Sequence, residues 1–184
     1  MLFLFAIALF VSATLLFMVQ PMFSKLVLPR LGGTPAVWIT CMLFYQAALL
    51  AGYAYAHLSA RWLGVRQAAV HVGWLLAVFL FLPLSVAQGW APRPEADPTP
   101  WLLMLLAVSV GLPFFVLSIT APMLQKWFAY TGHPAARDPY FLYAASNLGS
   151  MVALLGYPTL VEPYLTLAQQ ARVWGWGYGM LGGL

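Results

Sequence analysis

The positions of the charged residues constrain this chain more than any other feature of its sequence. Asp, Glu, Lys and Arg make up only 7% of its 184 residues, whereas 63% are hydrophobic. None of the four occurs in residues 1–24, 31–60, 67–92, 98–125 or 139–161. Each run exceeds the roughly 20 residues that cross a bilayer as an α-helix, and a charge at the bilayer centre costs about 2.5 kcal/mol or more. The sequence therefore predicts an all-α, polytopic membrane protein.

The uncharged runs predict five complete transmembrane helices in one domain that covers residues 1–184. We expect these spans at about 2–19, 35–57, 67–86, 101–125 and 139–157. Residues 167–184 predict a partial sixth span or an interfacial segment, because a helix that enters at Arg172 is too short to cross a bilayer. The partial span indicates that the chain is a fragment of a longer protein. Between the third and fourth spans, a cluster of prolines from Trp90 to Pro100 predicts a loop in water.

Basic residues at the span ends indicate the orientation. The loops after the second and fourth spans carry Arg61, Arg66, Lys126 and Arg137, and the opposite side carries Lys25, Arg30, Arg93 and Arg172. The two sides carry equal numbers of basic residues, but Arg61 and Arg66 flank one tight loop of the kind that the positive-inside rule weights most. We therefore expect a cytoplasmic N-terminus.

Small residues spaced by four positions predict close helix packing in two spans. The stripe in span 35–57 is Ala48, Gly52 and Ala56, and the stripe in span 139–157 is Ala145, Gly149 and Ala153. A packing seam is the main interpretation, and a groove that lines a substrate path is the alternative. Because the stripes match, we expect these two spans to pack against each other.

Polar side chains within the spans are expensive unless they are paired or face water. The candidates for a polar pathway or for interhelical contacts are Gln20, Gln46, Ser118, Thr120, Ser146, Asn147 and Ser150. Asn147 shares a helical face with Ser150, and we expect that face to point inward, toward Gln46. Hydrogen bonding between helices is the main interpretation.

Prolines within two spans predict breaks in the helix. Gln20 and Pro21 interrupt the end of the first span, and Gly111 and Pro113 interrupt the middle of the fourth. The carbonyl group that loses its donor at such a position must find another partner. An ordinary kink is the main interpretation, and a hinge that exposes this carbonyl to a ligand is the alternative.

The sequence offers no catalytic or cofactor site. His57, His71 and His133 lack metal-ligand spacing, and Cys41 is the only cysteine. No phosphate-binding loop, dinucleotide fingerprint or nucleophile elbow is present. The scattered basic residues form no stripe that could follow a nucleic-acid backbone. We expect no enzymatic activity in this chain, no cofactor, no metal and no nucleic-acid partner.

Three strings resemble the N-terminal membrane region of bacterial fused proteins, which join a major-facilitator-like part to a spermidine-synthase-like domain. The strings are FMVQPM at 17–22, PRLGGTPAVW at 29–38 and PYFLYAASNLGS at 139–150. The resemblance implies half of a major-facilitator-like bundle in a bacterial inner membrane, followed by a cytoplasmic synthase-like domain that is absent from these residues.

This resemblance implies an integral membrane module that anchors the cytoplasmic domain or passes a small solute to it. A transporter-like half that works as an oligomer is one alternative, and an accessory subunit of a membrane complex is another. The partners are then the lipid bilayer and either the synthase-like domain or another copy of the chain. A polyamine channel is disfavoured, because Glu162 is the only carboxylate near a span.

Overall fold

The structure is a computed structural model. All the regular secondary structure in the part of the chain that it describes is helical. That part is residues 1–86 and 97–184, and it contains no β-strand. The predicted all-α class is therefore confirmed. The expected loop from Trp90 to Pro100 lies mostly outside the described residues.

The first helix, α1 (Leu2–Leu31), is longer than predicted and is not interrupted at Pro21. Side chains around the proline supply donors to helix carbonyls: the Gln20 amide donates to Leu16 O (3.3 Å), and the Ser24 hydroxyl donates to Gln20 O (2.7 Å). Neither bond reaches Phe17 O, the carbonyl group that Pro21 leaves without its N–H donor, so the helix continues across the proline with this one backbone bond missing. The helix ends at Gly32, whose φ of 77° is readily adopted only by glycine.

The next two helices are joined by a tight turn. Helix α2 (Pro35–Trp62) begins with a proline in its first turn, where the missing N–H costs nothing. Helix α3 (Arg66–Val78) follows the turn and continues as the short 3₁₀ helix η1 (Phe79–Phe81). The predicted span 67–86 is too long, because Pro83 cannot supply an N–H to a continuing helix.

The segment predicted as the fourth span forms one continuous helix with an irregular middle. It comprises α4 (Pro98–Leu106), the π-helical turn η2 (Ala107–Gly111) and α5 (Leu112–Ala129). The π turn immediately precedes Pro113, so the helix is irregular where the sequence predicts a break but does not end there. At its start, the Asp97 carboxylate accepts a hydrogen bond from the Thr99 N–H (2.9 Å), and this bond holds the pKa of the Asp97 carboxyl below its usual range.

The chain stays helical beyond the predicted end of the fifth span. After the short 3₁₀ helix η3 (Pro134–Arg137), helix α6 (Tyr140–Gly156) passes into the π turn η4 (Tyr157–Val161) and then into α7 (Glu162–Tyr164). The predicted span 139–157 is therefore too short, and neither Pro158 nor Pro163 ends the helix. The wider π turn accommodates Pro158, and the Thr159 hydroxyl donates to Leu155 O (2.6 Å).

The last helix, α8 (Leu167–Gly183), begins five residues before Arg172, the entry point expected from the sequence. Its start is fixed by a capping box, in which Thr166 and Gln169 exchange hydrogen bonds between side chain and backbone. It packs on α1, where the buried Trp174 indole donates to Leu15 O (2.9 Å). The predicted partial span is thus a complete helix that packs one face against the bundle.

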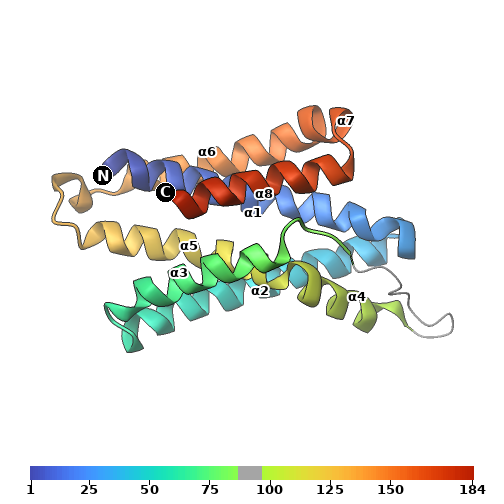
Figure 1. Cartoon of the computed structure of the whole chain (residues 1–184), viewed down its shortest axis with the longest axis horizontal. Helices are drawn as coiled ribbons and strands as arrows, with labels where there is room; N and C mark the ends of the chain where they lie inside the picture. The colour runs from blue at the N-terminus through green and yellow to red at the C-terminus, as the bar shows by residue number, and fades with distance from the viewer. Residues whose placement is uncertain (87–96) are drawn as a thin grey trace.

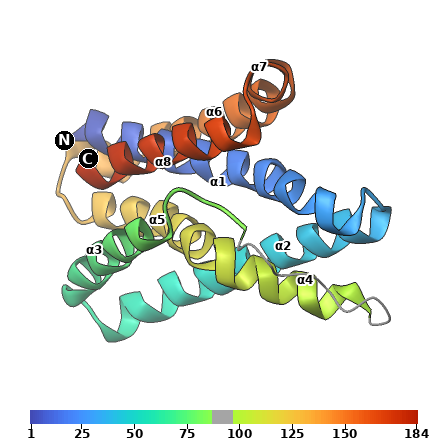
Figure 2. The same ribbon diagram turned by 45° about the vertical axis from the view of Figure 1, so that its right-hand side comes forward.

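The helices form an elongated bundle in which their ends alternate between two poles (Figure 1). The N-terminus, the turn between α2 and α3, the connection from α5 to α6, and the C-terminus lie at one pole, which we call the N end. The turn between α1 and α2, the start of α4, and α7 lie at the opposite pole, the far end. Figure 2 shows the same alternation after rotation of the bundle.

Three helices in the described part of the chain have the length and apolarity needed to cross a membrane. They are Leu2–Leu31, Pro35–Trp62 and Pro98–Ala129. Large apolar side chains are also exposed along the sides of the bundle. Those on α2 and α6 include Ile39, Met42, Leu43, Leu50, Leu148, Met151, Val152, Leu154 and Leu155. Soluble monomers rarely expose apolar surface on this scale, so the structure supports a membrane protein.

The two stripes of small residues lie at packing seams, but they do not face each other. A Cβ atom added at Gly149 would overlap the Phe10 carbonyl oxygen of α1, and one added at Gly52 would overlap the Ser118 side chain of α5. The main packing partner of α6 is α1, so the expected packing of α6 on α2 is wrong. Small residues permit close approach, but they do not select the partner helix.

Gly149 provides a test of the α1–α6 seam. We expect Gly149→Ala to lower the stability of the detergent-solubilised protein by about 1–3 kcal/mol, because the backbone of α1 cannot move aside cheaply. Gly156→Ala is the matched control, because an added Cβ there meets nothing within 4 Å. Thermal unfolding followed by circular dichroism measures both, and equal melting temperatures for the two variants would contradict the assigned seam.

Candidate functional site

The predicted polar pathway is not assembled in the structure. Gln46 and Asn147 are both exposed, and neither has a hydrogen-bond partner in the described part of the chain. The Ser150 hydroxyl donates to Ser146 O (3.0 Å) within its own helix. Asn147 and Ser146 line a shallow cleft together with Tyr53 of α2. The expected inward contact between Asn147 and Gln46 is therefore wrong.

Gln67 is the centre of a buried polar network that joins three helices. Its amide nitrogen donates to the Ser59 hydroxyl (2.8 Å) and to Ala56 O (3.3 Å) of α2, and its amide oxygen accepts from the Trp127 indole of α5 (3.3 Å). Sequence reasoning missed Gln67 because a polar residue in the first turn of a span needs no internal partner. The small-residue stripe, which includes Ala56, is the only signal that pointed to this region.

A second buried pair lies one turn further along α3. His71 Nε2 lies 3.3 Å from the Thr120 hydroxyl of α5, and this hydroxyl donates its single hydrogen to Val116 O (2.7 Å). The Nε2–H tautomer of His71 can donate to this hydroxyl while the hydroxyl donates to Val116 O. Nδ1 is buried without a partner among the described residues. Thr120 was a sequence candidate, whereas His71 was considered only as a metal ligand.

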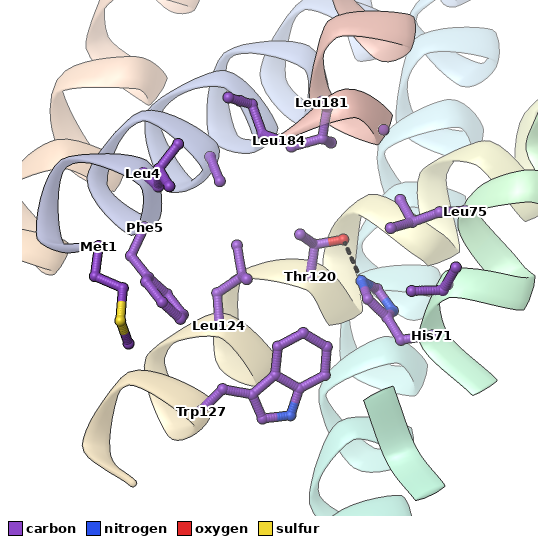
Figure 3. A pocket seen from close by; sticks show the side chains of 13 residues that line it. Met1, Leu4, Phe5, His71, Leu75, Thr120, Leu124, Trp127, Leu181 and Leu184 are labelled. Atoms are coloured by element: carbon purple, nitrogen blue, oxygen red, sulfur yellow. Dashed lines mark hydrogen bonds between the residues drawn. The ribbon is translucent and has the colours of Figure 1, made fainter. Parts of the chain in front are cut away.

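The His71–Thr120 pair borders a cavity of about 320 Å³ at the N end (Figure 3). The cavity lies between α1, α3, α5 and α8, and its lining includes Leu4, Phe5, Leu75, Leu124, Trp127 and Leu181. This lining is mostly apolar apart from His71 and Thr120, and no Asp or Glu side chain contributes to it. Its chemistry suits an apolar molecule and not a polycation.

Two charged side chains from different helices form an ion pair at the far end. Lys25 of α1 forms an ion pair with Glu162 of α7, and its ammonium lies 5.6 Å from the centre of the Tyr157 ring. The Tyr157 hydroxyl donates to the Gln170 side chain (3.1 Å), and the Gln170 amide donates to Leu165 O (2.8 Å). This cluster links α1, η4, α7 and α8. Its acidic member, Glu162, is the single carboxylate that the sequence places near a span.

These polar groups bond to one another and to backbone carbonyl groups. No group of three or more His, Cys, Asp or Glu in residues 1–86 and 97–184 is suited to hold a metal ion. The hydroxyl groups of Thr120 and Ser59 donate to backbone carbonyls of their own helices, so neither is poised as a nucleophile. The polar groups in the bundle thus join helices to one another.

Comparisons of the chain with protein-family models, with curated proteins and with solved structures find no match. The resemblance to fused synthase-like proteins therefore stays a prediction.

The Gln67 network predicts that substitution of Gln67 lowers the stability of the protein more than substitution of a glutamine that makes no hydrogen bond. We expect Gln67→Leu to lower stability by about 1–2 kcal/mol, because it leaves the Trp127 indole without an acceptor. Gln125→Leu is the control, because Gln125 has no hydrogen bond among the described residues. Tryptophan fluorescence during thermal unfolding in detergent measures both. A loss in Gln125→Leu as large as that in Gln67→Leu would argue against the network.

The ion pair at the far end predicts energetic coupling between α1 and α7. Lys25→Met and Glu162→Gln should each destabilise the bundle, and the double variant should lose less than the sum of the two losses. The expected coupling is about 0.5–1 kcal/mol, because both side chains are partly exposed. A double-mutant cycle on melting curves measures this coupling, and strictly additive losses would exclude it.

Proposed function

We propose that this chain is the integral membrane module of a bacterial inner-membrane protein of the fused spermidine-synthase-like type. In this proposal the module anchors a cytoplasmic domain that lies outside these residues. The observation that carries the proposal is the distribution of side chains: large apolar groups cover the sides of the bundle, and most charged groups lie at its two ends.

The proposed architecture has five complete crossings and a shorter sixth helix, α8, which returns the chain from the far end to the N end (Figure 1), as in half of a major-facilitator-like bundle. The alternation of helix ends between the two poles supports this topology (Figure 1). The continuation of α6 through η4 and α7 to Tyr164 also supports it, because this segment then exceeds the roughly 20 residues that a crossing needs.

Two observations favour anchoring over the passage of a small cationic solute. Glu162 is already neutralised by Lys25, and the cavity at the N end is lined mostly by apolar side chains. A path for an amine needs unpaired carboxylates or a chain of free acceptors within the bundle.

The basic residues support the proposed orientation. Arg61 and Arg66 flank the turn between α2 and α3, and Lys126 and Arg137 lie at the connection from α5 to α6. These segments all lie at the N end. Because positive residues in short loops are retained on the cytoplasmic side, we propose that both the N-terminus and Leu184 are cytoplasmic.

A transporter-like half that works as an oligomer is the second candidate. The cavity and the two π turns favour it, because π turns within helices often occur at functional sites. Solute uptake that depends on an intact Thr120 and is lost in Thr120→Val would support this candidate. No observation favours the accessory-subunit alternative.

Reporter fusions after Leu184 test whether the module can hold a domain on the cytoplasmic face. We expect a green fluorescent protein fusion to fluoresce and to stay in the membrane fraction after alkaline carbonate extraction. An alkaline phosphatase fusion at the same position should be inactive.

Cysteine labelling tests on which side of the membrane the far end lies. Cys41 is buried, so Cys41→Ala provides a background in which Gly33→Cys should react with an impermeant thiol reagent in intact cells. Active phosphatase after Leu184, or release of the fluorescent fusion by carbonate, would contradict the proposal.

A further inference from the structure

One cation at the N end lies partly inside the bundle without a counter-ion. Lys126, in the last turn of α5, is half-buried and has no hydrogen bond or ion pair within the described residues. Asp138 is the only acidic residue that the described chain contributes to this pole, and no ion pair joins it to Lys126. Lys126 therefore presents an uncompensated positive charge.

Two clefts meet at Lys126. The larger, of about 470 Å³, lies between the α2–α3 turn and the end of α5, and its lining includes Gly64, Val65, Trp127 and Tyr130. The smaller, of about 190 Å³, lies between α2 and α5, and its lining includes Tyr53, His57 and Met123. Ala60, Gln67 and Lys126 line both clefts.

The clefts combine a cation with apolar and aromatic surface. Val65 and Tyr130 are largely exposed, and Trp127 lies beside them in the larger cleft. Tyrosine and tryptophan are enriched at the level of lipid headgroups. Arg61 and Arg66 flank the same turn, and they add to the positive potential at this pole.

We propose that the clefts at Lys126 bind an anionic phospholipid, with the headgroup phosphate on the Lys126 ammonium and the acyl chains along the smaller cleft, past Tyr53 and toward the middle of the bundle. The charge complementarity selects this occupant, because a zwitterionic lipid brings its own cation to the site. Basic pockets between helices on the cytoplasmic side of a membrane bind lipid headgroups in this way. This inference rests on the proposed function, since it needs the N end to lie at headgroup level.

Lipid retention tests the inference. The full chain is reconstituted in vesicles of phosphatidylcholine that contain phosphatidylglycerol, extracted with mild detergent, and analysed by native mass spectrometry. We expect the wild-type protein to retain phosphatidylglycerol preferentially, and Lys126→Gln to reduce this preference about fivefold, the effect of one lysine near an anionic surface. Lys126→Arg should restore it.

The matched control is Arg137→Gln, which removes an exposed cation from the same pole but not from the clefts. It should retain phosphatidylglycerol as the wild type does. Equal losses in Lys126→Gln and Arg137→Gln would assign the preference to the general field of this pole and would overturn the site. Displacement of the lipid by millimolar inorganic phosphate would overturn it in favour of a free-phosphate site.

Vesicle flotation separates this inference from the proposed function. Failure of the chain to float with pure phosphatidylcholine vesicles, or its release by carbonate, would overturn both. Stable insertion without a preference for phosphatidylglycerol would overturn the lipid site alone. Melting curves of the Lys126 variants, compared with that of the wild type, exclude a loss of fold as the cause of reduced retention.

Discussion

Helix α1 is the element on which the rest of the bundle depends, because its backbone is the contact surface for two later helices. Gly149 brings α6 against the Phe10 carbonyl group, and one and a half turns further along α1 the Trp174 indole of α8 donates to Leu15 O. Both contacts join segments more than 130 residues apart in sequence. Helix α1 carries no charged residue before Lys25. Other helices can therefore pack around it without burying an ionised group.

Several polar side chains inside the bundle are also paired, and this pairing bears on function. Gln67 bonds to α2 and α5, His71 to Thr120, and Lys25 to Glu162. Each of these pairs joins different helices, so polar side chains in the bundle hold it together and do not form a continuous path through it. Lys126, a half-buried cation without a partner among the described residues, lies at the pole where headgroups are proposed to be. An anchoring module with a lipid contact accounts for both observations.

The sequence predicted the helices better than their contacts. Charge positions located the helical segments, and Gly32 and Pro83 end helices as their backbone chemistry requires. Pro21 was expected to interrupt its helix and does not, and Pro158 lies inside a continuous helix at a π turn, because an apolar segment has no water to take up its backbone groups if the helix ends. The partners of Gly52 and Gly149 could not be predicted, since a small-residue stripe fits any helix that approaches it. Gln67 escaped notice because its partners lie on two other helices.

The central claim is that the apolar sides of the bundle lie in lipid, and spin labels measure this directly. In the Cys41→Ala background, a nitroxide is attached at Met151→Cys, on the exposed side of α6, and at Val65→Cys, in the α2–α3 turn. After reconstitution in vesicles, power saturation compares collisions with oxygen, which concentrates in lipid, and with a water-soluble nickel chelate. The account predicts that oxygen dominates at Met151→Cys and the chelate at Val65→Cys. Equal access of the nickel chelate to the two positions would contradict it.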